Sequence, residues 1–380
     1  RTVSIGPNDS RLNKKGDFNI DIDYTDLNNG ANTVVITATD ESAGVTTANV
    51  TVNYQPFAGS WSPQTYTIDF ASAATVNQVA QVVDGNWVID GGKARPAAGE
   101  TGYDRLVALG DISWRDYTVT VPVTIHSIRI DKSPGVGLIV RWPGHYDAGN
   151  GLQPYAGWRR IGAMAWYRYD KATSTEGLQL LGSGGNTIGT SGFTLVPGTT
   201  YMFKVNVTSN ANPNKPATYR FKTWVQGQTE PAAWDIEASG LAGEQRNGSI
   251  LLVAHYADAS FGNVTVDLSS TQPKPVLNIS KTGTGTGTVT PNPQKTSYRF
   301  GEDVTLTAVA GGGSTFAGWQ GDASGSSPTT SIEMFADRNV TAVFADPAVQ
   351  TPISDDFSGC NLNTGLWTFV NPLSDATLVM

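Results

Sequence analysis

GVGLIVRW (residues 135–142) sets the pattern that decides the fold, and IGAMAWYRYDK (161–171), TYMFKVNVT (200–208) and TYRFKTWVQG (218–227) repeat it. Valine, threonine and aromatic residues recur in such short runs, and glycine, asparagine and aspartate separate them. This texture is typical of strands joined by tight turns. No window carries the i, i+3, i+4, i+7 apolar stripe of an amphipathic helix over three turns. The sequence therefore predicts an all-β protein, built as a string of β-sandwich domains.

Length and charge narrow the class of protein. A chain of 380 residues is too long for one ordinary core and predicts two to four domains. The net charge of −8 argues against nucleic acid as the main partner, because phosphate binding needs a basic field. The single cysteine, Cys360, excludes an intrachain disulfide, and no run of eighteen apolar residues predicts a membrane span. We expect a secreted or cell-surface protein.

Residues 64–270 form the largest expected unit. They open with YTIDF (66–70) and GNWVIDGGKAR (85–95) and close with YADASFGNVTVDL (256–268). This order resembles the laminin-G-like, concanavalin-type jelly roll, with GLIVRW as a middle strand and A-x-F-x-N-V as the final strand. The sequence departs from that pattern at one position. In the family an acidic residue often precedes the asparagine of the final strand, whereas here Gly262 precedes Asn263. The resemblance implies a central two-sheet sandwich that binds carbohydrate.

The segment before this unit also reads as strands. FNIDIDY (18–24), ANTVVITATD (31–40) and TTANVTVNY (46–54) alternate with period two and are separated by turn residues. They resemble the closing strands of a bacterial Ig-like sandwich. Because a complete sandwich of this kind needs about seven strands, we expect residues 1–54 to be an N-terminally truncated Ig-like domain. Residues 55–63 are expected to be a linker.

Two further units are expected after the central one. Following a linker at 271–275, residues 276–345 contain YRFGEDVTLTAVA, FAGWQGD and a closing NVTAVFA, an order that resembles the divergent internalin-B-type bacterial repeat. Val304, Leu306 and Ala308 should alternate inward, with Trp319 covering a small core. After a linker at 346–352, DDFSG and LNTGLWTF in 353–380 resemble the start of a second, truncated concanavalin-like domain.

Alternation predicts which strand residues share a face, since residues two apart point the same way. One phase of the central strands collects cationic and aromatic side chains: His126, Arg141, Trp166, Arg168, Arg220, Lys222, Trp224 and His255. Aromatic rings stack on sugar rings, and arginine or histidine reads hydroxyls and carboxylates. This phase is a candidate glycan-binding face, and its cations favour an acidic polysaccharide. The alternative is that these residues are solvated positions on two different sheets.

The loop WPGHYDAGNGLQPYAGWRR (142–160) is a second candidate for sugar binding. Aromatic and cationic side chains gather in it, and the candidates among them are Trp142, His145, Tyr146, Trp158 and Arg159. Binding groups commonly lie on loops held by a rigid scaffold. The alternative is a loop that packs on its own aromatic side chains.

Structural calcium is the candidate cofactor. The first and last strands of a jelly roll usually lie together, which would bring Asp69 near Asp267, while Asp84 and Asp90 flank the next turn. Oxygen ligands at a strand edge suit Ca²⁺. No EF-hand spacing occurs, and ordinary turn aspartates are the alternative reading.

No catalytic residues stand out. The Glu-x-Asp-x-Glu strand of laminarinase-like glycosidases is absent, and WDIE (234–237) lacks the third carboxylate. TIH (124–126) with YRYDK echoes jelly-roll alginate lyases without their supporting glutamine and arginine-rich strand. We therefore expect a non-catalytic, carbohydrate-binding region of an exported multidomain bacterial protein. A structural or adhesive surface array without a glycan ligand is one alternative, and a jelly-roll lyase or glycosidase is another.

Overall fold

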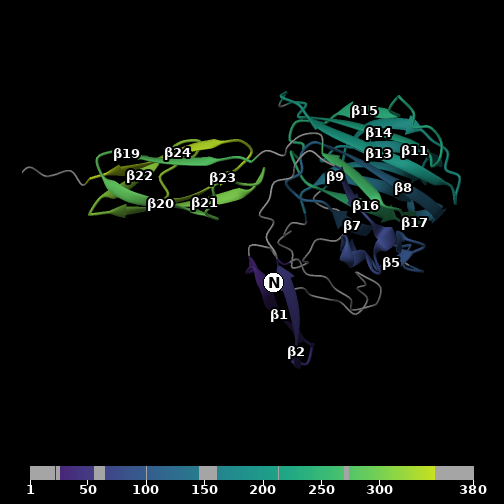
Figure 1. The fold of residues 1–380 in the computed structure, drawn as a ribbon, viewed down its shortest axis with the longest axis horizontal. Coiled ribbons are helices and arrows are strands. Elements are labelled where there is room, and N and C mark those ends of the chain that lie inside the picture. The colour runs from purple at the N-terminus through teal and green to yellow at the C-terminus, as the bar shows by residue number, and fades with distance from the viewer. Residues whose placement is uncertain are drawn as a thin grey trace, which may run out of the picture. The chain divides into compact units, whose positions relative to one another are not determined.

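The computed structural model describes residues 22, 26–54, 65–99, 101–144, 161–212, 214–268 and 274–346. The expected linker at 55–63 and the expected second concanavalin-like start at 353–380 lie outside these residues. The described chain contains strands and three short 3₁₀ helices, and no helix in it is long and apolar enough to cross a membrane. The prediction of an all-β protein is confirmed (Figure 1).

The strands follow one another along the chain in three groups. The first two are β1 (Gly30–Thr39) and β2 (Val45–Tyr54). The central group is β3 (Thr65–Ile68), β4 (Gln81–Asp84), β5 (Trp87–Asp90), β6 (Lys93–Pro96), β7 (Arg105–Leu109), β8 (Tyr117–Ile128), β9 (Gly135–Trp142), β10 (Ala163–Asp170), β11 (Thr175–Leu181), β12 (Thr187–Gly192), β13 (Thr200–Ser209), β14 (Ala217–Val225), β15 (Ile236–Ser239), β16 (Ser249–His255), β17 (Ala257–Phe261) and β18 (Val264–Leu268). The last group is β19 (Leu277–Thr282), β20 (Thr286–Asn292), β21 (Asp303–Gly311), β22 (Thr315–Gly321), β23 (Thr329–Glu333) and β24 (Arg338–Ala345), and the 3₁₀ helices are η2 (Phe70–Ser72), η3 (Val76–Gln78) and η4 (Ile130–Lys132).

Strands β1 and β2 form an antiparallel hairpin whose register runs from Gly30 opposite Tyr54 to Thr39 opposite Val45. Both strands alternate as the sequence predicted, but their apolar side chains are poorly covered. Val35 is 59% exposed and Val50 is 44% exposed. Within the described residues this hairpin has no core of its own, and the Ig-like interpretation of residues 1–54 stays a prediction.

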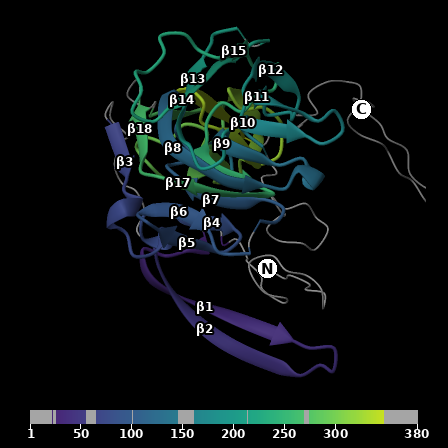
Figure 2. The same cartoon turned by 90° about the vertical axis from the view of Figure 1, so that its right-hand side faces the viewer.

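The central group forms two sheets. One has seven strands in the order β12-β11-β10-β9-β16-β7-β4. The other has nine, in which β15-β14-β13-β8-β17-β6-β5 form one path and β18 joins β3 to β8. Strands β3 and β18 pair antiparallel with Ile68 opposite Val264, so the first and last strands of this group lie together as expected. Figures 1 and 2 show the two sheets layered face to face.

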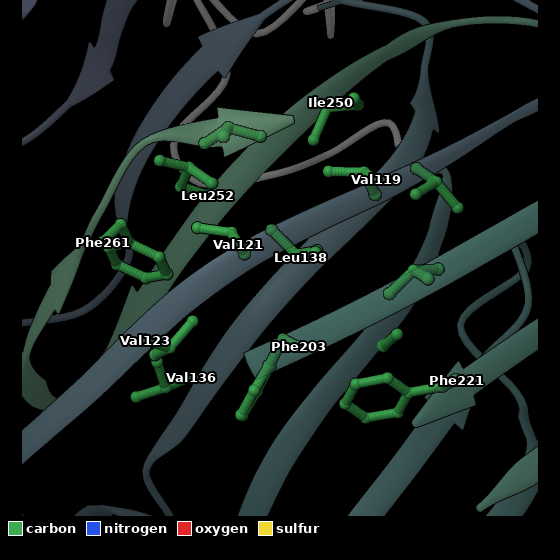
Figure 3. Close-up of a cluster of buried hydrophobic side chains, with 14 of the residues drawn as sticks. Val119, Val121, Val123, Val136, Leu138, Phe203, Phe221, Ile250, Leu252 and Phe261 are labelled. Carbon is green, nitrogen blue, oxygen red and sulfur yellow. The ribbon is translucent and has the colours of Figure 1, made fainter. Parts of the chain in front are cut away.

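The core lies between the two sheets and follows directly from alternation. Val119, Val121 and Val123 of β8 point inward with Phe203 of β13, and all are fully buried. Inward side chains of the seven-stranded sheet, such as Leu138 of β9, pack against them (Figure 3). Because every second residue of these strands faces the core, the intervening residues face away from it on both sheets. We call those two surfaces the outer faces.

The last group forms two three-stranded sheets, β19-β24-β22 and β20-β21-β23. Strand β19 runs parallel to β24, with Leu277 opposite Arg338. Val304, Leu306 and Ala308 are buried as predicted, and Trp319 is 5% exposed and packs against Phe316 at 5.0 Å between ring centroids. This small unit therefore has a core of its own, separate from that of the sandwich.

Replacing Phe203 by alanine is expected to lower the free energy of unfolding by about 3–5 kcal/mol, because it empties a fully buried ring site. Urea denaturation followed by tryptophan fluorescence measures the change. Val196→Ala is the matched control: its side chain is 56% exposed, and its effect should stay within about 0.5 kcal/mol. Equal effects of the two substitutions would contradict the assigned core.

Candidate functional site

Three of the predicted site residues meet at one end of the outer face of the seven-stranded sheet. Strand pairing places Gly135 of β9 between His255 of β16 and Arg168 of β10. One step further along the strands, Gly137 lies between Val253 and Trp166. Trp166, Arg168 and His255 therefore share a face, as alternation predicted.

Much of that outer face is apolar, which the sequence interpretation did not anticipate. Away from the polar end it carries a buried cluster made of Val83, Leu106, Ala108, Ile139, Trp142, Met164, Trp166, Leu251 and Val253. These strands are apolar on both sides here, although Gln179 of β11 and Thr190 of β12 also lie on this face. The candidate site is thus confined to the end of the sheet where β9 and β7 begin and β10 and β16 end.

The indole of Trp166 lies against Gly135 of β9, and the backbone of Trp166 lies against Gly137. A Cβ atom on Gly135 would come within 2.4 Å of the Trp166 ring, and one on Gly137 would come within 2.5 Å of the Trp166 Cα. The indole Nε1 donates a hydrogen bond to Gln179 Oε1 at 2.9 Å. With only 3% of its surface exposed, Trp166 is a fixed support and offers no open ring face to a ligand.

Arg168 lies on that support. Its guanidinium carbon is 4.7 Å from the centre of the Trp166 ring, and its Nη1 donates to the backbone carbonyl of Ser133. The side chain is half-buried, and this burial lowers the pKa of Arg168 from its ordinary value. No carboxylate of the described residues forms an ion pair with it. Other arginines do have such a partner within 4.0 Å: Arg95, Arg115, Arg129, Arg141, Arg220 and Arg338.

A buried histidine–aspartate pair lies beside the arginine. His255 Nδ1 is 2.6 Å from Asp104 Oδ1, and the two residues are 6% and 1% exposed. Burial raises the pKa of Asp104, and the hydrogen bond with His255 opposes that rise. The second oxygen, Asp104 Oδ2, is buried and has no hydrogen-bond partner among the described residues. The ring of His255 lies 6.1 Å from that of Trp166, which links the pair to the arginine support.

Two tyrosines complete the site at the surface. The ring of Tyr103 lies edge-on to His255 at 5.1 Å, and the ring of Tyr256 does so at 4.6 Å. Tyr103 is 53% exposed. Residues Tyr103, Asp104, Trp166, Arg168, His255 and Tyr256 are called the Arg168 cluster below. The sequence interpretation missed Tyr103, Asp104 and Tyr256, although Tyr103 and Asp104 stand in the turn before β7 and Tyr256 is the neighbour of His255.

Arg141 and Trp142 are not part of this site. Arg141 is 1% exposed, adopts a left-handed backbone conformation with φ of 56°, and directs its guanidinium into the end of the sandwich. It donates to the Arg115 and Gln245 carbonyls and pairs with Asp116 at 3.1 Å. Trp142 is 5% exposed and belongs to the apolar cluster of the outer face. Assigning these two residues to a ligand surface was wrong, because both serve packing.

Arg220 and Trp224 lie on the other sheet, as do His126 and Lys222. Arg220 pairs with Glu237 at 2.8 Å, and Lys222 lies 5.9 Å above the Trp224 ring. His126 Nε2 is 3.0 Å from Ser260 Oγ. One shared face for all the predicted residues is therefore wrong, because the topology places β8 and β14 in the nine-stranded sheet. The loop candidates His145, Tyr146, Trp158 and Arg159 lie outside the described residues.

The proposed calcium ligands do not converge. Although β3 pairs with β18, the antiparallel register sets Asp267 opposite Thr65, four residues away from Asp69. Asp69 accepts hydrogen bonds from Asn263 Nδ2 at 2.6 Å and Ser72 Oγ at 2.5 Å, and Asp267 accepts one from Thr65. Asp90 pairs with Arg95, and Asp84 is 5% exposed. Within the described ranges no three histidine, cysteine or carboxylate side chains form a metal-binding group.

Comparison with known proteins identifies one segment by family. Residues 277–348 match the divergent InlB B-repeat domain, which confirms the resemblance noted for 276–345. No curated protein matches the sequence.

Solved structures similar to this chain include three whose names refer to carbohydrates. They are an alginate lyase Aly36B mutant in complex with alginate tetrasaccharide (13% identity, 55% of this chain and 98% of that one, TM-score 0.35), carbohydrate-binding module CBM66 from Bacillus subtilis (18%, 50% and 94%, 0.31) and the metal-free Emp46p carbohydrate recognition domain (8%, 53% and 95%, 0.39). With identities and TM-scores this low, they carry no argument about ligand or activity. The specific laminin-G-like assignment stays a prediction.

Arg141→Met should lower the free energy of unfolding by about 3–5 kcal/mol, because it leaves buried carbonyls and the Asp116 carboxylate without their donor. Chemical denaturation monitored by circular dichroism measures the loss. Arg129→Met is the control, since Arg129 pairs with Asp131 at an exposed position. A stable Arg141→Met protein would contradict the packing role.

Asp69→Ala should lower the melting temperature, and this loss should be the same with calcium and with a chelator. Asp69 already accepts hydrogen bonds from Ser72 and Asn263, which also lower its pKa. Differential scanning calorimetry of the unmodified protein and of Asp69→Ala, each with calcium and with a chelator, measures the melting temperatures. A calcium-dependent rise in melting temperature that the substitution abolishes would restore Asp69 as a ligand.

Proposed function

We propose that the sandwich of residues 64–270 binds an acidic polysaccharide through the Arg168 cluster, as a non-catalytic module of an exported protein. The single observation that carries the proposal is the guanidinium of Arg168, which is half-buried, fixed on Trp166 and without a carboxylate partner among the described residues.

The partial burial of the Arg168 guanidinium is energetically unfavourable by itself. Taking a guanidinium partly out of water is unfavourable unless an anion or hydrogen-bond acceptors replace the lost solvent. The protein carries a net charge of −8, and the other arginines named above form ion pairs with carboxylates. Arg168 has one backbone carbonyl and a ring face. A carboxylate from a ligand would meet its remaining N–H groups and form charge-assisted hydrogen bonds.

The surroundings of Arg168 suit a uronic acid in a polysaccharide. Tyr103 is exposed and lies next to the histidine that contacts the Trp166 support, so a sugar ring can stack on its face while its carboxylate reaches the arginine. The negative net charge disfavours nucleic acid, whose dense phosphates need a wide basic surface. A small number of cations beside aromatic rings, Arg168 over Trp166 and Arg129 over Tyr256, instead suits a chain whose charges are spaced by sugar units.

The Asp104–His255 pair favours a second candidate function, β-elimination on the same ligand. A base removes the proton at C5 of a uronate, the C4–O bond breaks and a C4–C5 double bond forms, and the departing oxygen takes a proton from the protonated base or from water. Arg168 would neutralise the carboxylate and His255, oriented by Asp104, would take the proton. Binding is the better-supported function because His255 is only 6% exposed. Absorbance of the unsaturated product separates the two, and no increase excludes elimination.

Arg168→Gln should weaken binding to alginate or polygalacturonate at least tenfold, because a charge-assisted hydrogen bond contributes about 1.5–3 kcal/mol. Affinity electrophoresis through gels containing each polysaccharide measures the dissociation constant. Tyr103→Ala should weaken binding by a smaller factor.

Arg220→Gln is the matched control, since it changes net charge equally on the other sheet. Its retardation in the gel should match that of the unmodified protein. The proposal is wrong if no acidic polysaccharide retards the protein, or if Arg168→Gln and Arg220→Gln bind alike; the first result favours a structural surface array.

A further inference from the structure

The outer face of the nine-stranded sheet carries an apolar row that crosses three strands. Met202 of β13 lies opposite Trp224 of β14 on one side and opposite Pro122 of β8 on the other. All three side chains are partly exposed. Adjacent strands are about 4.8 Å apart, so the row extends about 10 Å at right angles to the strands. This face is opposite to the one that carries the Arg168 cluster.

A row of hydroxyl groups begins beside Pro122 and continues away from the apolar row, across β18 and β3. Thr120 of β8 pairs with Thr265 of β18, which in turn pairs with Thr67 of β3. Thr120 and Thr265 are partly exposed and Thr67 is exposed. The two rows are neighbours because Thr120 lies two residues before Pro122 on the same strand. The surface thus offers an apolar row that hydroxyls extend beyond Pro122, while Lys204 and Lys222 lie beside Met202 and Trp224.

Most cations of this face have a carboxylate partner, although Lys93 of β6 donates to the Thr124 hydroxyl at 3.1 Å and forms no ion pair with a described carboxylate. Lys204 and Lys222 both pair with Glu230, at 2.9 and 2.7 Å, and these bonds lower the pKa of Glu230. Arg220 pairs with Glu237. The apolar row itself carries no charged side chain, in contrast to the site at Arg168.

The ammonium of Lys222 also fixes the aromatic end of the row. It lies 5.9 Å from the centre of the Trp224 ring and 4.6 Å from that of Trp234, and it donates to the Pro231 carbonyl at 2.6 Å. Both tryptophans are partly exposed. Rings held in place lose little side-chain entropy when a ligand binds, which favours their use as a stacking surface.

We infer that this face is a second glycan-binding surface, and that it takes an extended, neutral polysaccharide lying across the strands. The sugar faces stack on Trp224 and lie along Met202 and Pro122, while ring hydroxyls bond to the threonine row. The absence of unpaired charge among the described side chains of the row selects a neutral ligand over an acidic one. The inference is independent of the Arg168 cluster, which lies on the other sheet.

Co-sedimentation of the full 380-residue chain with insoluble cellulose, chitin and β-1,3-glucan tests the surface. At least one of them should retain the protein, and Trp224→Ala should weaken retention about tenfold, the loss expected for one stacked aromatic ring. Trp224→Phe should retain most of the binding. Thr120→Val, which keeps the shape and removes the hydroxyl, should weaken it severalfold.

Arg168→Gln serves as the cross-control: it should lose acidic polysaccharide and keep the neutral one, and Trp224→Ala should do the reverse. Circular dichroism and melting temperature confirm that each variant is folded. Retention by none of the three polysaccharides overturns the inference, and so does equal retention of folded Trp224→Ala. Self-association that Trp224→Ala abolishes, without any polysaccharide binding, would assign the face to a second copy of the chain instead.

Discussion

The contact between the two central sheets is the constraint on which the rest of the sandwich depends. Val121 and Phe203 on one sheet and Leu138 on the other are fully buried, and each fixes which side of its strand faces inward. A strand cannot turn one residue toward the core without turning its neighbours outward. The core therefore determines both outer faces, and with them every strand side chain that a ligand can meet.

Alternation predicted much of this arrangement but not how strands are shared between sheets. It placed Trp166 and Arg168 on one face and buried Leu306 in the small C-terminal unit, and both are observed. It could not separate Arg168 from Arg220, because period two is a property of one strand and sheet membership depends on long-range pairing. Asp69 and Asp267 show the same limit: the strands pair, but the register keeps the carboxylates apart.

Local irregularity explains the other misassignments. Arg141 stands where the pairing of β9 with β16 shifts, and its left-handed backbone turns the side chain away from the regular phase. Tyr103 and Asp104 were missed because they precede β7 in a turn, where alternation carries no information. Asp104 also has a positive φ, of 39°. The parts of the site that lie on regular strands were predictable, and the parts supplied by turns were not.

The two outer faces differ most in the partners of their cationic side chains. On the nine-stranded sheet, Lys222 is enclosed by Glu230 and two tryptophans. On the seven-stranded sheet, Arg168 has an indole and one carbonyl. The same residue types thus produce a surface of mostly paired cations on one side and a guanidinium without an ion pair on the other, and the difference comes from where the carboxylates lie.

Two glycines of β9, Gly135 and Gly137, leave the space in which Trp166 lies. A Cβ on Gly135 would clash with the indole of Trp166, and one on Gly137 would clash with the backbone of Ala165 and Trp166. The support under the Arg168 guanidinium therefore depends on two positions that have no room for a side chain.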